Sequence, residues 1–276
     1  MDAWREVTRD GVRLVCRDFG GEGQPVLLLH GLAGHAGEWA QTASWLTQRS
    51  RVVALDGRGH GRSERVPDDV SRAAQVADAA FVIERLRLGS VVVIGQSLGA
   101  LTAVSLAAER PDLVRALVVV DGSPAGGSEG ADVAARDIRQ ALRQWPVPFA
   151  SRTAAEQFFQ ERFGGRLAAV AWADGLEQRD GGWWPRFDIE VMVRTLHAAV
   201  VTPSWEEWEQ VSCPTLLVRS GDDYVEPDVA GEMLERQPRA RLVEMMDAAH
   251  DVHLDRPDGW QETLSTFLDS LDGTAS

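Results

Sequence analysis

A serine with a glycine two residues away on each side ends a run of β-branched residues in VVVIGQSLGA (91–100). The run predicts a buried strand, and the Ala/Leu-rich residues 97–110 predict a helix directly after it. A serine on such a sharp turn projects its hydroxyl outward, and side chains at Gly95 and Gly99 would collide across the turn. The helix also offers its positive N-terminus and the Leu98 amide to a developing negative charge. The pattern makes Ser97 a candidate nucleophile.

A nucleophilic serine needs a base, and His250 in AAHDVHLDRP (248–257) is the candidate. It follows the last predicted strand and precedes the last predicted helix, so the base comes after the serine and late in the chain. His253 is close by, but His250 comes first after the strand end, and Ala248 and Ala249 leave room around it. We expect no metal here, because no third ligand is near and the spacing is not that of zinc-binding helices.

The segment HGLAGHAGEW (30–39) contains candidate donors for the oxyanion of an acyl-transfer intermediate. Gly31 allows the chain to bend so that the amide of Leu32 can point into the site, where Leu32 and Leu98 would share the negative oxygen. Trp39, just past this turn, is a candidate residue of the substrate pocket. The segment is neither a P-loop nor a dinucleotide-binding glycine motif.

All of these candidates follow predicted strands. Apolar runs bounded by turn residues occur at 25–31, 51–59, 90–95, 114–122, 214–221 and 240–245. Such runs suit strands that are buried on both faces of a parallel sheet. Helical patterns at 71–88, 97–110, 228–236 and 257–271 fill the gaps, and Asp10-Gly11 between two further runs predicts an antiparallel hairpin. The result is an α/β fold whose parallel strands bring the candidates to one edge of the sheet.

Residues 123–210 interrupt the alternation of strands and helices. This stretch has helical pieces, Gly/Pro turns and several tryptophans: Trp145, Trp172, Trp183, Trp184, Trp205 and Trp208. We therefore expect a core formed by residues 1–122 and 211–276, with a helical insertion at 123–210.

Composition and charge restrict the class of protein. The 276 residues are 44% hydrophobic and 25% charged, which is typical of a globular chain. A net charge of −14 disfavours nucleic acid and anionic membranes as partners. The charged N-terminus lacks the apolar core of a secretory signal, so we expect a cytoplasmic protein. Two cysteines, Cys16 and Cys213, indicate neither a disulfide framework nor a zinc site.

Five segments in order resemble the motifs of the α/β-hydrolase family, in its small esterase, lactonase and thioesterase branch. They are HGLAG (30–34), DGRGHGRS (56–63), GQSLG (95–99), SGDDYVEP (220–227) and AAHDVHLDRP (248–257). The resemblance covers nearly the whole chain. It implies an α/β-hydrolase fold, a cap over Ser97, a small-molecule substrate and no cofactor. Asp56, Arg58 and Ser63 are expected to form a structural hydrogen-bond cluster, because buried polar groups must be satisfied.

The resemblance also implies a buried acid that orients the histidine, and three aspartates are candidates. Asp223 fits the family spacing G-x-x-D-x-x-x-P if Ser220 replaces the glycine. Asp222 is adjacent and could serve after a small shift. Asp121 follows the preceding strand, where some related esterases carry their acid. We favour Asp223, and each of the three would play the same role.

The sequence thus predicts a serine hydrolase that cleaves a carboxylic ester, lactone or thioester through an acyl-enzyme. A serine at this turn argues against the dehalogenase and epoxide hydrolase chemistry of the family, which uses an aspartate there. The tryptophan-rich cap indicates a mostly apolar pocket for a bulky or aromatic acyl group. The alternatives are a lyase or carbon–carbon bond hydrolase with the same triad, and a small-molecule-binding protein that has lost turnover.

Overall fold

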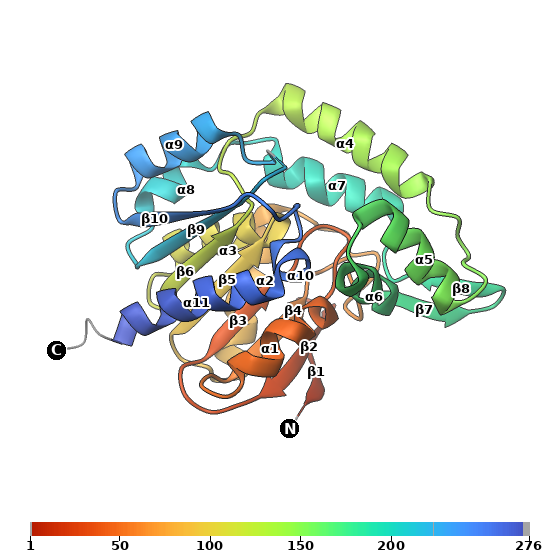
Figure 1. Ribbon diagram of the computed structural model, residues 1–276, viewed down its shortest axis with the longest axis horizontal. Coiled ribbons are helices and arrows are strands. Elements are labelled where there is room, and N and C mark those ends of the chain that lie inside the picture. The colour runs from red at the N-terminus through yellow and green to blue at the C-terminus, as the bar shows by residue number, and fades with distance from the viewer. Residues whose placement is uncertain (1, 223, 273–276) are drawn as a thin grey trace.

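The computed structural model describes residues 2–222 and 224–272. An eight-stranded sheet forms its centre, in the order β1-β2-β4-β3-β5-β6-β9-β10 (Figure 1). The strands are β1 (Ala3–Arg9), β2 (Val12–Gly20), β3 (Val26–Leu29), β4 (Val52–Asp56), β5 (Val91–Gln96), β6 (Val114–Val120), β9 (Thr215–Ser220) and β10 (Ala240–Met245). β2 is antiparallel to β1 and β4, and the other neighbours are parallel. The predicted mostly parallel sheet with an N-terminal hairpin is confirmed.

The order of the strands creates a switch point beside β3. From β3 the chain moves to β4 on one side and then returns to β5 on the other. The loops that follow β3 and β5 therefore diverge, and a crevice opens between them at the carboxyl edge of the sheet. This is where the sequence places the candidate donors and the candidate nucleophile.

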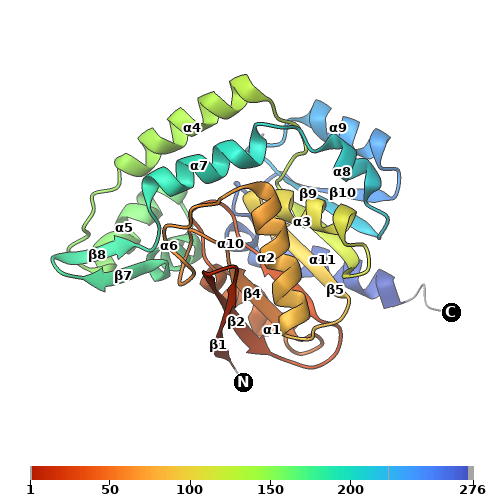
Figure 2. The ribbon, with the colours of Figure 1, turned by 180° about the vertical axis from the view of Figure 1, so that it is seen from behind.

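Helices cover both faces of the sheet. They are η1 (Ala36–Trp39), α1 (Ala40–Leu46), α2 (Arg72–Arg85), α3 (Leu98–Glu109), α8 (Trp205–Gln210), α9 (Pro227–Arg236), α10 (Val252–Asp255) and α11 (Pro257–Asp272). Leu27 and Leu29 of β3 face α2 and α3, whereas Val26 and Leu28 face α1 and α11. Alternate residues of one strand thus enter separate cores. Figure 1 shows α1 and α11 in front of the sheet, and Figure 2 shows α2 and α3 in front.

The insertion lies between β6 and β9. It contains α4 (Ser128–Arg143), α5 (Arg152–Phe163), α6 (Arg166–Asp174), β7 (Leu176–Arg179), β8 (Gly182–Pro185) and α7 (Ile189–Val200). β7 and β8 form a separate antiparallel pair, so the insertion is not wholly helical as expected. α4 and α7 lie side by side in both ribbon views (Figures 1 and 2).

Helix α8 belongs with the sheet layer, although the expected boundary at residue 210 places it in the insertion. Trp208 of α8 is fully buried in the core beneath α2 and α3. Its indole Nε1 donates a 2.8 Å hydrogen bond to the carbonyl oxygen of Met233 in α9. This anchored tryptophan fixes α8 to the core before β9 begins, so we propose that the core resumes at α8.

The expected polar cluster at residues 56–63 is confirmed as structural. The buried Asp56 carboxylate accepts hydrogen bonds from the amides of Ala36 (2.6 Å) and Arg62 (2.8 Å). Arg58 pairs with the buried Asp78, and Ser63 accepts a hydrogen bond from the amide of Val15. These contacts fix the loop after β4 against its neighbours, and they satisfy polar groups that burial would otherwise leave unpaired.

No helix in residues 2–222 and 224–272 combines the length and apolar character that crossing a membrane requires.

Candidate active site

Ser97 occupies the turn between β5 and α3 in a strained conformation, with φ of 53° and ψ of −114°. A Cβ on Gly95 would lie 2.2 Å from the carbonyl oxygen of Gly99, and a Cβ on Gly99 would lie 2.3 Å from that of Leu29. The two glycines are therefore required for close backbone approach, as the sequence predicts. Such strain in a non-glycine residue is typical of functional sites, because the surrounding structure must stabilise it.

His250 and Asp121 are in direct hydrogen-bond contact. The Nδ1 atom of His250 lies 2.6 Å from Oδ2 of Asp121, a residue with no solvent exposure. The same carboxylate accepts hydrogen bonds from the Ser220 amide (3.0 Å, to Oδ1) and the Ser220 hydroxyl (2.8 Å, to Oδ2). Asp121 is thus held in one orientation, and Nδ1–H of His250 is the donor to it. This leaves Nε2 of His250 as an unprotonated nitrogen that can accept a proton.

The other two candidate acids are placed differently. Asp223, which the sequence favours, lies outside the described residues. Asp222 is exposed, and its carboxylate contacts the Ser220 hydroxyl and accepts a 3.3 Å hydrogen bond from the Tyr224 amide. Of the aspartates in the described part of the chain, Asp121 is the one that is hydrogen-bonded to His250.

The surroundings of His250 raise its pKa. Burial by itself lowers the pKa of His250, but the hydrogen bond to Asp121 and the charges of Asp251, Asp121 and Asp222 outweigh burial. The imidazolium that forms when His250 takes a proton is thus stabilised.

This raised pKa leads to a prediction about pH. Only the neutral imidazole can act as a base, so kcat/KM should fall as the pH drops through the raised pKa, above the ordinary value of about 6.5. Asp251→Asn removes one of the charges that raise the pKa, so the acidic limb should move to lower pH. Asp247→Asn is the matched control, because Asp247 is an exposed carboxylate of the same loop that pairs with Arg256. The measurement is the pH profile of kcat/KM for the parent and both variants. An acidic limb at the same pH in Asp251→Asn as in the parent would contradict the prediction.

Two backbone amides near Ser97 are free to donate. Among the hydrogen bonds of the described residues, neither the amide of Leu32 nor that of Leu98 has a partner. Leu98 begins α3, so its amide adds to the positive end of that helix. Ala33, next to Leu32, has a positive φ of 62°, which marks a second strained turn at the site. Both amides are available to a negatively charged oxygen.

Gln96 connects the loops that surround Ser97. Its Nε2 atom donates a 3.1 Å hydrogen bond to the carbonyl oxygen of His250. Its Oε1 atom lies against Gly31, where a Cβ would approach it to 2.1 Å. Gln96 therefore positions the loop of the candidate base relative to the loop of the candidate donors.

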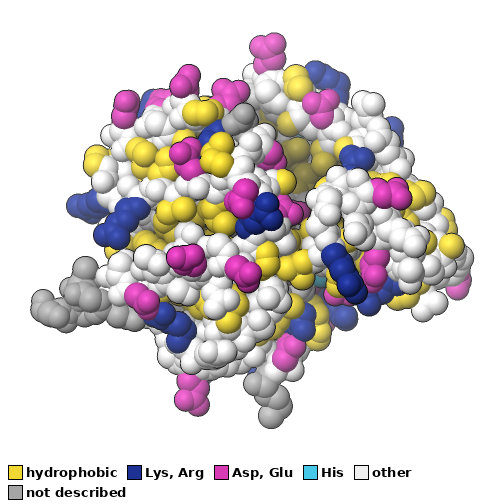
Figure 3. Space-filling model, in the orientation of Figure 1, with side chains coloured by type: hydrophobic (Ala, Val, Ile, Leu, Met, Phe, Trp, Pro, Cys, Tyr) yellow, Lys and Arg dark blue, Asp and Glu magenta, His cyan; other side chains and the backbone are white. Residues whose placement is uncertain are grey.

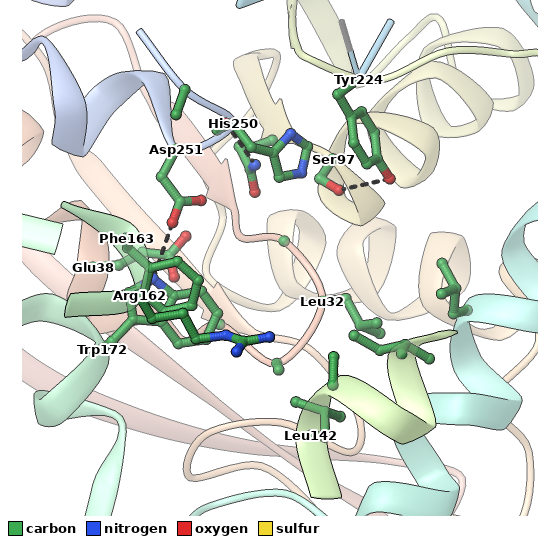
Figure 4. Close-up of a pocket in the computed structure, with 18 of the residues that line it drawn as sticks. Leu32, Glu38, Ser97, Leu142, Arg162, Phe163, Trp172, Tyr224, His250 and Asp251 are labelled. Carbon is green, nitrogen blue, oxygen red and sulfur yellow. Dashed lines mark hydrogen bonds between the residues drawn. The ribbon is translucent and has the colours of Figure 1, made fainter. Parts of the chain in front are cut away.

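Tyr224 is a site residue that the sequence did not indicate. Its ring packs on the imidazole of His250, with 3.9 Å between the ring centroids. The Ser97 hydroxyl donates a long hydrogen bond of 3.5 Å to the Tyr224 hydroxyl (Figure 4). Tyr224 as a whole is 53% exposed, but its hydroxyl lies among site residues, and this local burial raises its pKa against the opposing hydrogen bond from Ser97. The nearby carboxylates raise it further, so the phenol remains protonated at neutral pH.

A cavity of about 610 Å³ lies above Ser97 and His250. Apolar side chains from the insertion form much of its lining, among them Ile138 and Leu142 of α4 and Trp172 of α6. The insertion therefore lies over the catalytic candidates. Figure 3 shows hydrophobic side chains recessed below α4, with acidic side chains spread over the surrounding surface. The volume is within the usual range for small-molecule sites.

Charged side chains also line the cavity. The sequence predicted a mostly apolar pocket and did not indicate these charges. Asp255 is among the lining residues, as are Glu38, Asp251 and Arg162, which Figure 4 labels. The indole of Trp172 donates a 2.9 Å hydrogen bond to Asp251. Burial raises the pKa of Glu38 and Asp251 and raises that of Asp255 to about 6. Protonation of Asp255 thus reduces the negative charge of the cavity as the pH falls toward 6.

Trp39 does not line this cavity, so the expectation for this residue is wrong. Its side chain is fully buried and stacks on His253, with ring centroids 4.0 Å apart. It packs in the core beneath α1 and α11, together with Trp260. The tryptophans that do line the cavity are Trp145 and Trp172 of the insertion.

Asp121, Asp222 and His250 also place one donor atom each within 4.8 Å of one another, a spacing that a metal ion could bridge. The Nδ1 atom of His250 is already hydrogen-bonded to Asp121, however, and Ser220 satisfies the rest of that carboxylate. We therefore interpret the group as a proton-transfer arrangement.

Two signals in the sequence could have found the missed residues. Ser220 stands where the family spacing expects glycine, and the structure shows that its hydroxyl and amide hold Asp121. Tyr224 is the only tyrosine of the chain and follows the same strand. Gln96 has no such signal, because its role depends on a loop that is distant in the sequence.

Comparisons with known proteins identify the family of this chain. The sequence model of the alpha/beta hydrolase family matches residues 26–261, and the chain belongs to this family. It is 31% identical to the sn-1-specific diacylglycerol lipase ABHD11 of Mus musculus, over 88% of this chain and 80% of the relative. It is 28% identical to an esterase of Mycobacterium tuberculosis, over 91% and 85% of the two chains. The solved structure of E-2-(acetamidomethylene)succinate hydrolase matches with a TM-score of 0.89 and 25% identity, covering 98% of this chain and 100% of the other. The protein is a hydrolase with the α/β-hydrolase fold.

Proposed function

We propose that this hydrolase cleaves a carboxylic ester, lactone or thioester of a bulky apolar substrate through an acyl-enzyme on Ser97. The observation that carries the proposal is the 2.6 Å contact between His250 and the buried Asp121, next to a serine on a strained turn. This arrangement has the parts that nucleophilic acyl transfer requires. The names of the lipase and esterase relatives support an ester as the substrate.

In the proposed mechanism, His250 takes the proton of Ser97 through Nε2 while Ser97 Oγ attacks the carbonyl carbon. Asp121 holds the imidazole in the required tautomer and stabilises its positive charge. The amides of Leu32 and Leu98 donate hydrogen bonds to the negative oxygen of the intermediate. His250 then gives its proton to the leaving group, and water releases the acyl group by the same steps. Attack requires the Ser97 hydroxyl to turn from Tyr224 toward His250, because in this structure it donates to the phenol.

The lining of the cavity supports an apolar substrate. Apolar side chains from α4 to α7 cover Ser97, and part of the acidic lining has a raised pKa. The large cavity is therefore better suited to a hydrocarbon or aromatic group than to a strongly polar one.

We expect the protein to hydrolyse aryl esters, thioesters or lactones and to lose this activity in Ser97→Ala. The loss should be about 10⁴-fold or more, because removal of the nucleophile abolishes the covalent route. Steady-state rates on a panel of the three substrate classes test this, with thermal unfolding of Ser97→Ala as the control for its fold. Equal rates in the parent and Ser97→Ala would contradict the proposal.

A further inference from the structure

Ser97 lies where two cavities meet. Besides the large cavity, a second one of about 340 Å³ has Ser97 in its lining, together with Leu101, Ala125 and Val229. Tyr224, Leu196 and Val200 line both cavities and so form the wall between them. A carbonyl carbon bonded to Ser97 Oγ would therefore have space on two sides.

The residues around Ser97 are distributed unequally between the two cavities. His250, Asp251 and Leu32 line the large cavity, and none of them lines the second. Leu98 lines the second cavity and not the large one. Ser97 itself lines both cavities, so a carbonyl group bonded to its Oγ lies at the junction.

The chemistry of acylation relates these positions to the two halves of an ester. The bond between Ser97 Oγ and the carbonyl carbon forms, and the bond from that carbon to the leaving oxygen breaks. The serine proton passes to His250 Nε2 and then to the leaving oxygen, which departs as an alcohol. The leaving oxygen must therefore lie within hydrogen-bond reach of His250, and His250 lines the large cavity.

We infer that the two halves of the substrate bind on opposite sides of Tyr224, with the leaving group in the large cavity and the acyl chain in the second. This inference rests on the proposed function and assigns the subsites of the same active site. It differs from the expectation that the apolar space under the cap receives the acyl group. Ser123 and Glu226 also line the second cavity, but Leu101, Val225 and Val229 give it apolar walls that suit an acyl chain.

Tyr224 has two roles in this arrangement. Its ring packs on His250 and keeps the halves of the substrate apart. Its hydroxyl accepts the bond from Ser97, and the phenolic hydrogen has no acceptor among the described residues. That hydrogen is available to an oxygen of the substrate at the junction of the cavities.

The test compares the same substitution in the two cavities. Ala125→Trp reduces the space of the second cavity, and Ala134→Trp on α4 reduces that of the large one. Val229→Trp is a second variant of the second cavity. One substrate series varies the acyl chain, from p-nitrophenyl acetate to octanoate. The other varies the alcohol, from methyl to octyl acetate.

We expect Ala125→Trp and Val229→Trp to lower the octanoate-to-acetate ratio of kcat/KM about tenfold or more relative to the parent. Ala134→Trp should instead lower the octyl-to-methyl ratio. The reverse pattern would overturn the assignment of the two halves. An unchanged octanoate-to-acetate ratio in both Ala125→Trp and Val229→Trp would overturn the second cavity as a subsite. A parent that hydrolyses no ester would overturn the proposed function and this inference with it. A parent that hydrolyses esters but shows the wrong pattern would overturn this inference alone.

Discussion

Asp121→Asn is expected to lower kcat by about 10³- to 10⁴-fold, because the asparagine would hold His250 in the wrong tautomer. The Ser220 amide donates to one oxygen of Asp121, so the single oxygen of asparagine would remain there. The amide nitrogen of the asparagine would then face Nδ1 of His250. The imidazole would have to carry its proton on Nε2, which could no longer accept the proton of Ser97.

Measurement of kcat for three variants decides which aspartate is the triad acid. Asp222→Asn and Asp223→Asn make the same chemical change in the neighbouring loop and serve as matched controls. We expect both to retain far more activity than Asp121→Asn. A large loss in Asp223→Asn together with near-parental activity in Asp121→Asn would show that the acid comes from the loop after β9.

Gly99→Ala is the second change with a large expected effect. A Cβ at residue 99 would lie 2.3 Å from the carbonyl oxygen of Leu29 and 2.7 Å from that of His30, so α3 would have to move away from β3. Such overpacking against backbone should cost about 3 kcal/mol or more in the free energy of unfolding. In a chain of this size the Tm should fall by about 6 °C or more. Displacement of Ser97 should also lower the rate of ester hydrolysis.

Gly231→Ala is the control for this substitution, because Gly231 lies in α9 and a Cβ there would meet no atom within 4 Å. Alanine has the higher helix propensity, so this variant should keep or raise the Tm. Thermal unfolding of both variants provides the comparison. A Tm and activity of Gly99→Ala equal to those of the parent would show that the turn tolerates a side chain.

Much of the fold could be predicted from the sequence because its strands are buried on both faces. The run PVLLLHG predicts β3, whose alternate side chains enter two separate cores. The pair β7–β8 could not be predicted in this way. It is short and half-exposed, and it lacks a continuous apolar run. The expected boundary at residue 210 could not take account of Trp208, because its anchoring in the core depends on packing that helical periodicity does not reveal.

Some residues of the candidate site could likewise be identified from the sequence, and others could not. Ser97 could be identified because its glycines reflect local backbone geometry, which a short segment records. The contact between Asp121 and His250 joins residues 129 positions apart, so the spacing of a single motif could not select this acid. The expectation for Trp39 failed because proximity in the sequence to the turn after β3 does not fix the direction of its side chain. The indole packs on His253 beneath the sheet instead of lining the cavity.

The most direct test of the central claim is the intact mass of the protein after reaction with a fluorophosphonate, with Ser97→Ala measured in parallel. A fluorophosphonate modifies a serine that is activated by a base and an oxyanion site. The account predicts a single adduct on the parent and none on Ser97→Ala. An unmodified parent, or an adduct that persists in Ser97→Ala, would contradict the assignment of Ser97 as the activated nucleophile.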